Sequence, residues 1–300
     1  MTSIRPWTGS DLRSILALTD LEHWGFVRDD LTRLMSLAPD GCLLTEEGGT
    51  PAAVTTLIRY GDDAWIGTVL VRPDCRGKGV GSVIVEAALL RAGAAGVRTV
   101  RIHSYTRTQK FYEGLGFEVE SGMTAIRFTT SPPCNGLVED SFEVPPVPVR
   151  PMAVKDLRGV LELDHRLFGS RRDHLIERGL EEFPGLAYLA DTVEGRITAF
   201  AQARGGTGGI ELGPVAVDPG MDSARAAAVA RELCRPILRS AAKLGEGVEL
   251  SCYRMNRPAC DLFSGLGFLE GFETVQMVFG EGRAGPDPTG IWALSALEKG

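Results

Sequence analysis

The sequence predicts a mixed α+β fold that is used twice in one chain of 300 residues. The length is about twice that of a usual domain. Apolar residues make up 44% of the chain, which is enough to fill two cores. Short motifs recur in the same order in both halves, about 145 residues apart, and a proline-rich stretch separates the halves. We therefore expect two copies of one domain joined by a linker.

Several short motifs carry this internal repeat. They form the following pairs: Ile4-Arg5-Pro6 and Val149-Arg150-Pro151, Asp11-Leu12-Arg13 and Asp156-Leu157-Arg158, Val69-x-Val71-x-Pro73 and Val215-x-Val217-x-Pro219, Gly114-Leu115-Gly116-Phe117 and Gly265-Leu266-Gly267-Phe268. Chance matches would not keep both order and spacing. The predicted division is an N-terminal domain over 1–130, a linker over 131–146 and a C-terminal domain over 147–300.

The first elements follow from hydrophobic periodicity and from start and stop residues. A strand at 3–6 precedes a helix that opens at Thr8 or Ser10 and has leucines at helical spacing through Leu18. A second helix, over 29–37, begins at an acidic pair and stops before a proline. Both helices are therefore expected before the main strands.

The remaining elements of the copy alternate between strands and helices. Strands are expected at 41–47, 51–59 and 64–72, with a turn at Gly61-Asp62-Asp63 between the last two. An apolar helical face predicts a long helix over 79–94. The copy then closes with a strand (98–104), a helix (107–115) and a strand pair (117–129). The result is an α+β unit built around a sheet.

A glycine-rich turn leads from the strand that ends near Val71 into the helix over 79–94. It reads Arg76-Gly77-Lys78-Gly79-Val80-Gly81-Ser82. Glycines have no Cβ, so their backbone N–H groups can approach a ligand closely. The helix N-terminus adds unpaired donors and a positive dipole end, and Arg76 and Lys78 add formal charge. This pattern favours a pyrophosphate, while its spacing excludes both a dinucleotide-binding GxGxxG and a P-loop.

These residues resemble the GNAT superfamily of acyl-CoA-dependent N-acyltransferases. The loop matches the signature [R/Q]-x-x-G-x-[G/A], and residues 112–117 match the downstream Y-x-x-x-G-F. A subgroup with two GNAT domains in one chain is also similar, through Trp24 with Asp29-Asp30, Pro39-Asp40-Gly41 and Trp65-Ile66-Gly67. The resemblance implies two tandem GNAT-like folds, each a mostly antiparallel central sheet with a splayed strand pair and flanking helices.

The resemblance also implies roles for individual residues toward acetyl-CoA as co-substrate. The backbone of Val69, Leu70 and Val71 would bind the pantetheine arm. The pyrophosphate would be held by Arg76, Gly77, Lys78, Gly79, Val80, Gly81 and Ser82. Tyr112 would protonate the departing thiolate, because a phenol of pKa about 10 donates a proton without ionising at neutral pH. Tyr105 stands where the family often has Asn, so the contact of that Asn with the cofactor is not implied here. No metal is expected.

The second copy lacks the features of the phosphate loop. The arginine and the three glycines are replaced by Asp222, Ser223, Arg225 and Ala227. Carboxylates at this place would repel a pyrophosphate, and Asp222 or Ser223 is a good N-cap that satisfies the helix from its own chain. The tyrosine position holds Phe263, which has no proton to give. We expect a degenerate second domain that packs on the first and shapes the acceptor pocket, or that serves stability alone.

Acyl transfer to an amine also needs a group that takes a proton. The candidate bases near the predicted site are Asp62, Asp63, Glu22, His23 and His103. His103 titrates in the right range, and Trp24 is able to stack on an apolar or cationic acceptor. A final strand is expected at Ile291-Trp292-Ala293-Leu294. None of these residues identifies the acceptor.

Composition excludes several classes of function. The net charge of −7 is spread evenly over the halves, so neither half is a basic surface for nucleic acid. No apolar run reaches the roughly 18–20 residues of a membrane span, and the N-terminus has no apolar signal region. The six cysteines have no paired spacing, which predicts reduced thiols in a cytoplasmic protein.

The predicted function is therefore transfer of an acetyl group from acetyl-CoA to a small-molecule amine, by direct attack in a ternary complex. One alternative is an acetyltransferase that acts on a protein N-terminus or lysine. A second alternative, outside enzymes, is an acyl-CoA-binding sensor or scaffold that does not require Tyr112.

Overall fold

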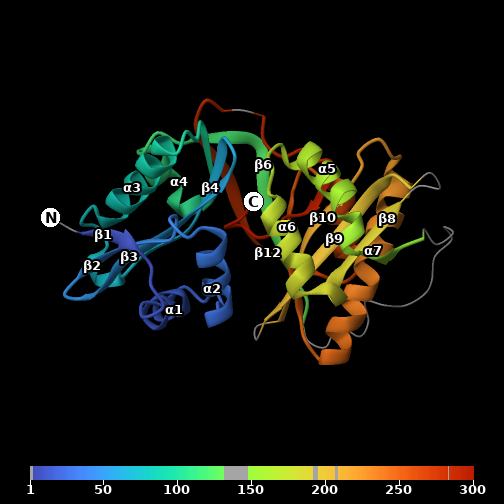
Figure 1. Ribbon diagram of the computed structural model, residues 1–300, viewed down its shortest axis with the longest axis horizontal. Helices are drawn as coiled ribbons and strands as arrows, with labels where there is room; N and C mark the ends of the chain where they lie inside the picture. Colours follow the sequence, from blue (N-terminus) through green and yellow to red (C-terminus); the bar gives the residue numbers. More distant parts are fainter. Residues whose placement is uncertain (1–2, 132–147, 192–194, 207–208, 283) are drawn as a thin grey trace. The chain divides into compact units, whose positions relative to one another are not determined.

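The computed structural model describes residues 3–131, 148–191, 195–206, 209–282 and 284–300 (Figure 1). The chain divides into two compact units. Unit 1 comprises Met1–Val119, Gln276–Arg283 and Leu297–Gly300, and unit 2 comprises Glu120–Val275 and Ala284–Ala296. Most of the predicted linker lies outside the described residues.

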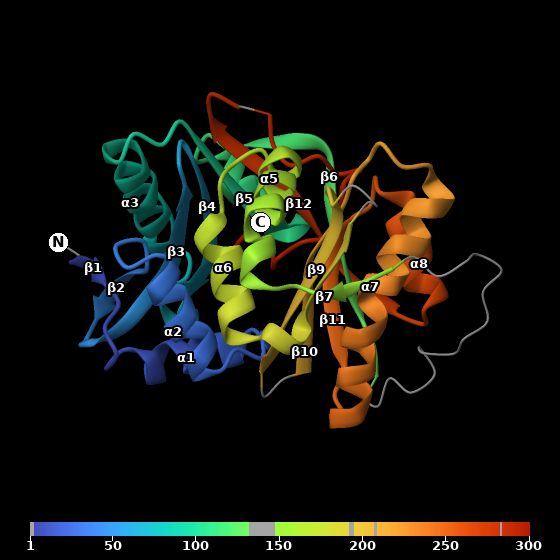
Figure 2. The same cartoon turned by 45° about the vertical axis from the view of Figure 1, so that its right-hand side comes forward.

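Unit 1 has a sheet with helices on both faces (Figures 1 and 2). Its strands, in order along the sheet, are β1 (Ile4–Pro6), β2 (Leu43–Glu47), β3 (Thr50–Tyr60), β4 (Asp63–Val71), β5 (Thr99–Tyr105) and the last residues of β12 (Leu269–Gly280). Its helices are α1 (Leu12–Leu21), α2 (Arg28–Leu37), α3 (Val80–Ala94) and α4 (Gln109–Glu113). Strands β1 to β4 pair antiparallel, whereas β4 and β5 pair in parallel.

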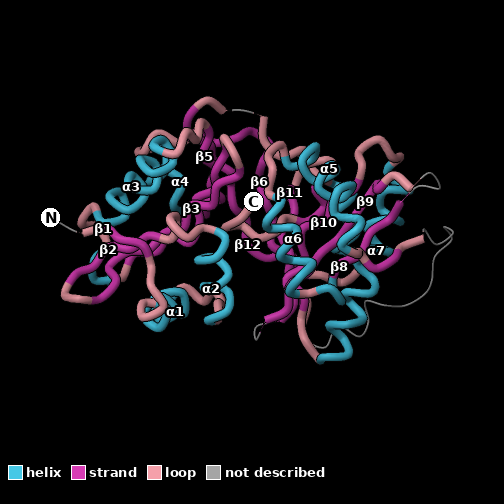
Figure 3. The backbone as a smooth tube through the Cα atoms, in the orientation of Figure 1, coloured by secondary structure: helices cyan, strands magenta, loops and turns pink. Residues whose placement is uncertain are grey.

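Unit 2 repeats this plan (Figure 3). Its strand order is β6 (Glu118–Thr129), β11 (Val248–Tyr253), β10 (Gly209–Val217), β9 (Ile197–Gly206), β8 (Ala187–Asp191) and β7 (Arg150–Pro151), with β13 (Ile291–Ala293) also paired to β10. Its helices are α5 (Leu157–Phe168), α6 (Asp173–Glu182), α7 (Ser223–Leu244) and α8 (Arg257–Gly265). Here β10 and β11 are the parallel pair, so the mostly antiparallel α+β fold is confirmed in both units.

The repeated motifs make the same contacts in each unit. Arg5 binds Asp11 at 2.8 Å in unit 1, and the equivalent Arg150 binds Asp156 at 2.7 Å in unit 2. A second carboxylate, Glu46 or Asp191, completes the cluster on the paired strand. Hydrogen bonds from the arginine hold the pKa of the Asp11 carboxyl well below its usual range. The predicted duplication is therefore confirmed by conserved geometry as well as by sequence spacing.

The closing strands are exchanged between the units. The sequence predicts a strand pair over 117–129 within the first copy, and this prediction is wrong. The segment forms the single strand β6, which continues through Gly122 although that residue has φ +78°. Most of β6 belongs to unit 2, where Ile126 pairs with Cys252. Conversely, β12 belongs to the second copy in sequence, but its last residues lie in unit 1.

Aromatic side chains stabilise this exchange in both directions. Phe128 of β6 packs on Phe263 in the core of unit 2, with ring centroids 6.1 Å apart. The equivalent Phe279 of β12 packs on Phe117 in unit 1 at 5.5 Å. Burying one such ring contributes about 1.5–3 kcal/mol, so each unit depends on a strand that the other copy's sequence supplies.

No helix within the described residues is long and apolar enough to cross a membrane. Their five cysteines are free thiols.

Candidate active site

Strands β4 and β5 of unit 1 part before either ends. Their parallel pairing runs from Asp63 and Thr99 to Ile66 and Ile102 and stops there. The β3–β4 register shifts just beyond this point, and Thr68 has φ +51°, which is unusual for a residue other than glycine. The rest of β4, which includes the predicted Val69, Leu70 and Val71, therefore has no β5 partner. An extended ligand can pair with such an unaccompanied strand edge.

The glycine-rich loop follows β4 and leads into α3. A short 3₁₀ turn (Pro73–Cys75) precedes it, and α3 begins at Val80. Gly77 and Gly79 have φ of +73° and +80°, a conformation that side chains disfavour, and a Cβ on either glycine would meet nothing within 4 Å. Gly79 is the N-cap of α3 and makes no side-chain cap hydrogen bond. The exposed N-terminal donors of α3 therefore fit an anion such as a pyrophosphate.

The two charged side chains of the loop differ in their surroundings. Arg76 Nε donates to the carbonyl of Val71 at 2.9 Å, and its guanidinium binds Glu22 at 2.6 Å. Glu22 also faces Arg107 at 3.6 Å. Lys78 is exposed. Glu22, which was predicted as a candidate base, thus lies at the phosphate loop and is bound by two arginines. The Val71 carbonyl is already in use by Arg76.

Tyr112 is placed on α4, which is shorter than the predicted helix because residues 106–108 form a 3₁₀ turn. The side chain is buried between Phe111 and Phe117, with ring centroids 4.9 and 5.8 Å away. Burial raises the pKa of the phenol above its ordinary value. The phenol is therefore protonated at neutral pH, as proton donation requires.

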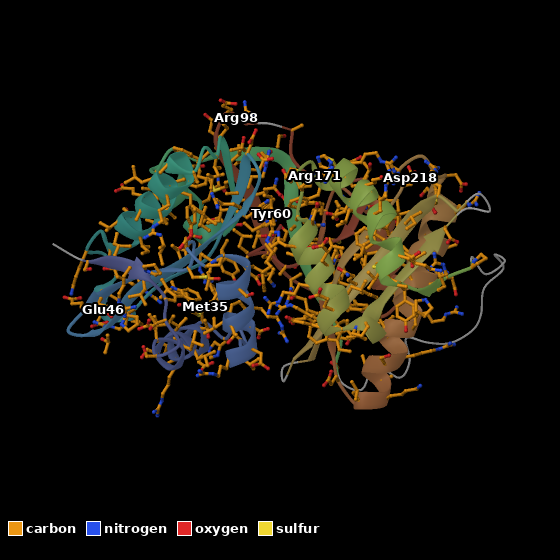
Figure 4. The ribbon with its side chains drawn as sticks, in the orientation of Figure 1. Met35, Glu46, Tyr60, Arg98, Arg171 and Asp218 are labelled. Atoms are coloured by element: carbon orange, nitrogen blue, oxygen red, sulfur yellow. The ribbon has the colours of Figure 1, made fainter. Side chains whose placement is uncertain are left out.

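Three of the predicted base and acceptor residues already have partners within unit 1. Asp62 binds Arg98 at 2.6 Å on the surface (Figure 4), and the buried Asp63 lies 3.7 Å from Arg101. His103 stacks on Trp65 at 5.3 Å, and burial lowers its pKa to about 3, which makes it a poor proton acceptor at neutral pH.

The segment between α1 and α2 carries two further candidates. His23 is exposed and has φ +57°. Trp24 is half-buried and packs on Phe26 with ring centroids 5.9 Å apart. Trp24 stays a predicted acceptor contact.

A segment that the sequence did not point to also lies on β4. Residues Leu297–Gly300 belong to unit 1, and a Cβ on Gly67 would stand 2.5 Å from Glu298 Cβ. Gly67 is the residue that directly follows the last β4–β5 pair. The missed signal was the glycine of Trp65-Ile66-Gly67, which must be small because another backbone crosses it. Its partner is more than 200 residues away in the sequence, so local patterns do not reveal it.

In unit 2 the equivalent of the phosphate loop is helical. Helix α7 begins at Ser223, three residues earlier than the counterpart position of α3. The Asp222 side chain accepts from the backbone N of Arg225 at 2.9 Å, which is the predicted N-cap. One of its first backbone donors is therefore bonded to a side chain of the chain itself, whereas the N-cap of α3, Gly79, has no side chain to offer.

The parted strands of unit 2 are filled by the chain. Strands β10 and β11 pair only at Ile210–Val248 and Glu211–Glu249. The predicted final strand, β13, then lies beside β10, with Val215 opposite Ala293. Leu294 N donates to the Ser251 carbonyl of β11 at 2.8 Å. An extended ligand therefore has no unpaired strand edge here.

The remaining counterparts in unit 2 are also occupied. Phe263 is fully buried and packs on Phe268 at 5.7 Å. Asn256 caps α8 by accepting from Ala259 N at 3.1 Å and donates to the Ile291 carbonyl at 3.1 Å. Across the described part of the chain, no group of three or more His, Cys, Asp or Glu side chains is placed to hold a metal ion.

Solved structures share this architecture. A protein from Pyrococcus horikoshii is 20% identical with a TM-score of 0.76, over 100% of this chain and 96% of that one. A GCN5-related N-acetyltransferase from Sphaerobacter thermophilus is 19% identical with a TM-score of 0.68, over 96% and 98%. A tandem GNAT protein from the clavulanic acid biosynthesis pathway is 14% identical with a TM-score of 0.68, over 95% and 100%. These likenesses concern the fold.

Family models account for both halves of the sequence. The model of the acetyltransferase (GNAT) family matches residues 7–117, and that of an acetyltransferase (GNAT) domain matches residues 160–291. No curated protein sequence matched the chain. The two matches cover both copies of the repeat and agree with the tandem fold, so the chain belongs to the GNAT superfamily of acetyltransferases, with two GNAT domains in tandem.

Proposed function

We propose that unit 1 transfers an acetyl group from acetyl-CoA to the amine of a small molecule, and that unit 2 binds no CoA. The observation that carries this proposal is the contrast between equivalent places in the two units. In unit 1 the strands part beside an uncapped helix N-terminus. In unit 2, β13 fills that place and Asp222 caps the helix.

The predicted cofactor-binding and catalytic residues other than Val71 each have a definite part in this proposal. Acetyl-CoA supplies the reactive thioester when it is bound. The backbone of Val69 and Leu70 binds and orients the pantetheine arm along β4. The loop from Arg76 to Ser82 binds the pyrophosphate through backbone N–H groups and the charge of Lys78. Tyr112 donates its proton to the leaving sulfur, which its protonated state at neutral pH permits.

Direct transfer needs both substrates on the enzyme together. Unit 1 offers no described cysteine near the loop other than Cys75, whose thiol donates to Glu47 at 3.0 Å. This hydrogen bond to a carboxylate is the main cause that raises the pKa of that thiol, and desolvation adds to it. A thiol held in its neutral form is a weak nucleophile, which supports direct attack by the amine rather than an acyl-enzyme.

The experiment is an assay of CoA release with a thiol reporter, run with a panel of small amines and with lysine-containing and N-terminally free peptides. We expect turnover with at least one small amine. If only peptides are acetylated, the acceptor is a protein and the proposal of a small-molecule acceptor is wrong. Binding of acetyl-CoA without turnover of any acceptor would contradict the enzymatic proposal and favour a sensor.

A further inference from the structure

We propose that Cys252 and Cys260 form a reversible oxidation site in unit 2, at which hydrogen peroxide converts two neighbouring thiols into a disulfide. The inference goes beyond the proposed function, because it needs neither acetyl-CoA nor an acceptor. It assigns a role to two cysteines that the acetyltransferase proposal does not use. Both are free thiols in the structure, so the structure describes the site in its reduced form.

The first observation is the contact between the two sulfur atoms. Cys252 lies on β11 and Cys260 lies on α8, which follows that strand after a short turn (Figure 2). Their Sγ atoms are 3.6 Å apart and share a buried hydrogen bond. An S–S bond is about 2.05 Å long. A disulfide therefore needs a closer approach of two sulfur atoms that are already neighbours.

The second observation is that hydrogen bonds fix the turn between the two cysteines. Asn256 N donates to the Tyr253 carbonyl at 2.9 Å. The Asn256 side chain accepts from Ala259 N at 3.1 Å and donates to the Ile291 carbonyl at 3.1 Å. These bonds hold the start of α8 at the end of β11. The folded chain therefore keeps the two thiols together.

The third observation is that the two thiols have different surroundings. Cys252 is 0% exposed and Cys260 is 6% exposed, so a small oxidant reaches Cys260 first. A hydrogen bond from the Cys252 thiol is the main cause that lowers the pKa of Cys260, and the guanidinium groups of Arg254 and Arg257 lower it further. The same hydrogen bond raises the pKa of Cys252. Cys260 therefore supplies the thiolate, which is the reactive form, and Cys252 is its protonated partner.

The other described cysteines lie in different environments. Cys42 and Cys234 are buried, and desolvation raises the pKa of each thiol to about 12. Cys75 donates to a glutamate carboxylate. Within the described residues, Cys252 and Cys260 are the one pair of cysteines whose sulfur atoms are in contact. We therefore expect oxidation to be selective for this pair.

The reaction balances with hydrogen peroxide as the oxidant. The Cys260 thiolate attacks one peroxide oxygen, so that an S–O bond forms, the O–O bond breaks and the leaving hydroxide takes up a proton to become water. The Cys252 sulfur then attacks the sulfenic sulfur of Cys260. An S–S bond forms, the S–O bond breaks, and the hydroxyl leaves as a second water with the Cys252 proton. The two sulfur atoms lose two electrons and the peroxide gains them.

The test maps the disulfide in the folded full chain by tryptic digestion and mass spectrometry. Trypsin cuts after Arg254, between the two cysteines, and leaves the Arg257–Pro258 bond intact. The two thiols therefore fall in separate peptides, 244–254 and 255–283. The protein is treated with hydrogen peroxide, its remaining thiols are blocked with N-ethylmaleimide, and it is then unfolded and digested.

We expect peroxide to join the peptides 244–254 and 255–283 faster than it oxidises Cys42 or Cys234, by a factor of about ten or more. The reason is that each unit by which a thiol pKa falls raises its thiolate fraction tenfold near neutral pH. Dithiothreitol should separate the peptides again by thiol–disulfide exchange, in which its own two thiols are oxidised. In urea the selectivity should disappear, because the fold no longer holds the two thiols together.

Two variants and a matched control separate the roles of the thiols. Cys252→Ala should leave Cys260 as a sulfenic acid, which dimedone labels. Cys260→Ala should show no dimedone label at Cys252. Cys234→Ala removes another buried cysteine of unit 2 and should leave the linked peptides unchanged. Thermal unfolding shows that each variant is folded.

Two results overturn the inference. If the folded, unchanged protein gives no such linked peptides, or links either thiol to another cysteine such as Cys134 instead, the contact is packing alone. A dimedone label on Cys252 in Cys260→Ala, with none on Cys260 in Cys252→Ala, would contradict the assigned order of the reaction. The first result needs no variant, so it holds even if a variant fails to fold. Neither result bears on the acetyltransferase proposal.

Discussion

At the scale of single residues, Tyr112 is the side chain whose environment most directly fits a chemical step. It is buried among aromatic rings, and burial raises its phenol pKa. Replacing it by phenylalanine removes one oxygen from a packed position and should cost little stability. We expect Tyr112→Phe to lower kcat by about 10²–10⁴-fold, the usual contribution of a positioned general acid.

The same experiment needs a binding control and a matched tyrosine. Acetyl-CoA affinity of Tyr112→Phe should stay unchanged by calorimetry. Tyr105→Phe is the matched variant, because Tyr105 is a half-buried tyrosine of unit 1 whose ring lies under Arg107 at 4.6 Å. An unchanged kcat in Tyr112→Phe would remove Tyr112 from the mechanism.

Glu22 gives a second prediction at this scale. Its carboxylate holds Arg76 at 2.6 Å and faces Arg107 at 3.6 Å, beside the loop proposed to bind pyrophosphate. A phosphate that uses either guanidinium must compete with Glu22. Because exposed ion pairs contribute about 0.2–1 kcal/mol, Glu22→Gln should tighten CoA binding by at most about fivefold.

Salt dependence separates this competition from a structural effect. The gain in Glu22→Gln should shrink as ionic strength rises, because the pair is partly exposed and salt screens it. Glu113→Gln, an exposed glutamate of α4 bonded to Gln109, should leave CoA affinity unchanged. Weaker CoA binding in Glu22→Gln would show instead that Glu22 positions Arg76 for the ligand.

The sequence located the glycine-rich loop from its local chemistry. Two of the loop glycines, Gly77 and Gly79, have positive φ, which only glycine adopts readily. The environments of charged residues were not predictable in the same way. Whether Glu22 contacts a phosphate loop or an acceptor depends on a partner 54 residues away. Glu298 is a still more distant case, since its neighbour is Gly67.

At the scale of elements, α3 and α7 show how a few substitutions change a ligand site into a helix turn. Two glycines at positive φ keep residues 77–79 out of α3, while the equivalent residues 223–225 form the first turn of α7 behind the Asp222 cap. A side-chain cap is thus present at the N-terminus of α7 and absent at that of α3.

This difference predicts that an aspartate at equivalent positions of the two units has different effects on CoA binding. Gly79→Asp places a carboxylate at a helix N-terminus with φ +80° and should abolish CoA binding, through both strain and repulsion. Arg225→Asp, at the equivalent position, places a carboxylate in the first turn of α7, where it is favourable. Calorimetry with CoA should show no binding for the first variant and unchanged affinity for the second. Retained binding in Gly79→Asp would contradict the assigned loop.

The order of the elements was predictable, but their pairing was not. Periodicity located the helices and strands of the first copy up to residue 115 to within a few residues, whereas the strand pair predicted over 117–129 is the single strand β6. It did not show that β6 pairs with β11, or that β13 lies between β10 and β11. A strand pattern records which side chains are buried, not which strand supplies the hydrogen bonds. The closing strands β6 and β12 come from equivalent positions of the repeat. Each can therefore pair with the equivalent strand of either copy.

At the scale of the whole molecule, the exchange makes the two copies dependent on each other. A fragment of residues 1–130 contains β6 but lacks β12, and it also lacks Phe279, which packs on Phe117. It would expose the edge of β5 and leave Phe128 without Phe263. We expect this fragment to unfold at a much lower temperature than the full chain, or to aggregate, as unpaired edges promote. A cooperative transition at the temperature of the full chain would contradict this.

The exchange also decides how the number of active sites must be measured. Neither copy can be removed without taking a strand from the other unit, so the claim that unit 2 binds no CoA has to be tested on the full chain. Titration calorimetry with CoA should give one site per chain, because β13 and the Asp222 cap close the second place. Gly79→Asp is the decisive companion, since it blocks unit 1 alone and should reduce the number of sites from one to zero. Two sites in the full chain, or one remaining in Gly79→Asp, would show that unit 2 binds CoA despite β13. Both results together therefore locate the CoA site in unit 1 without separating strands that fold together.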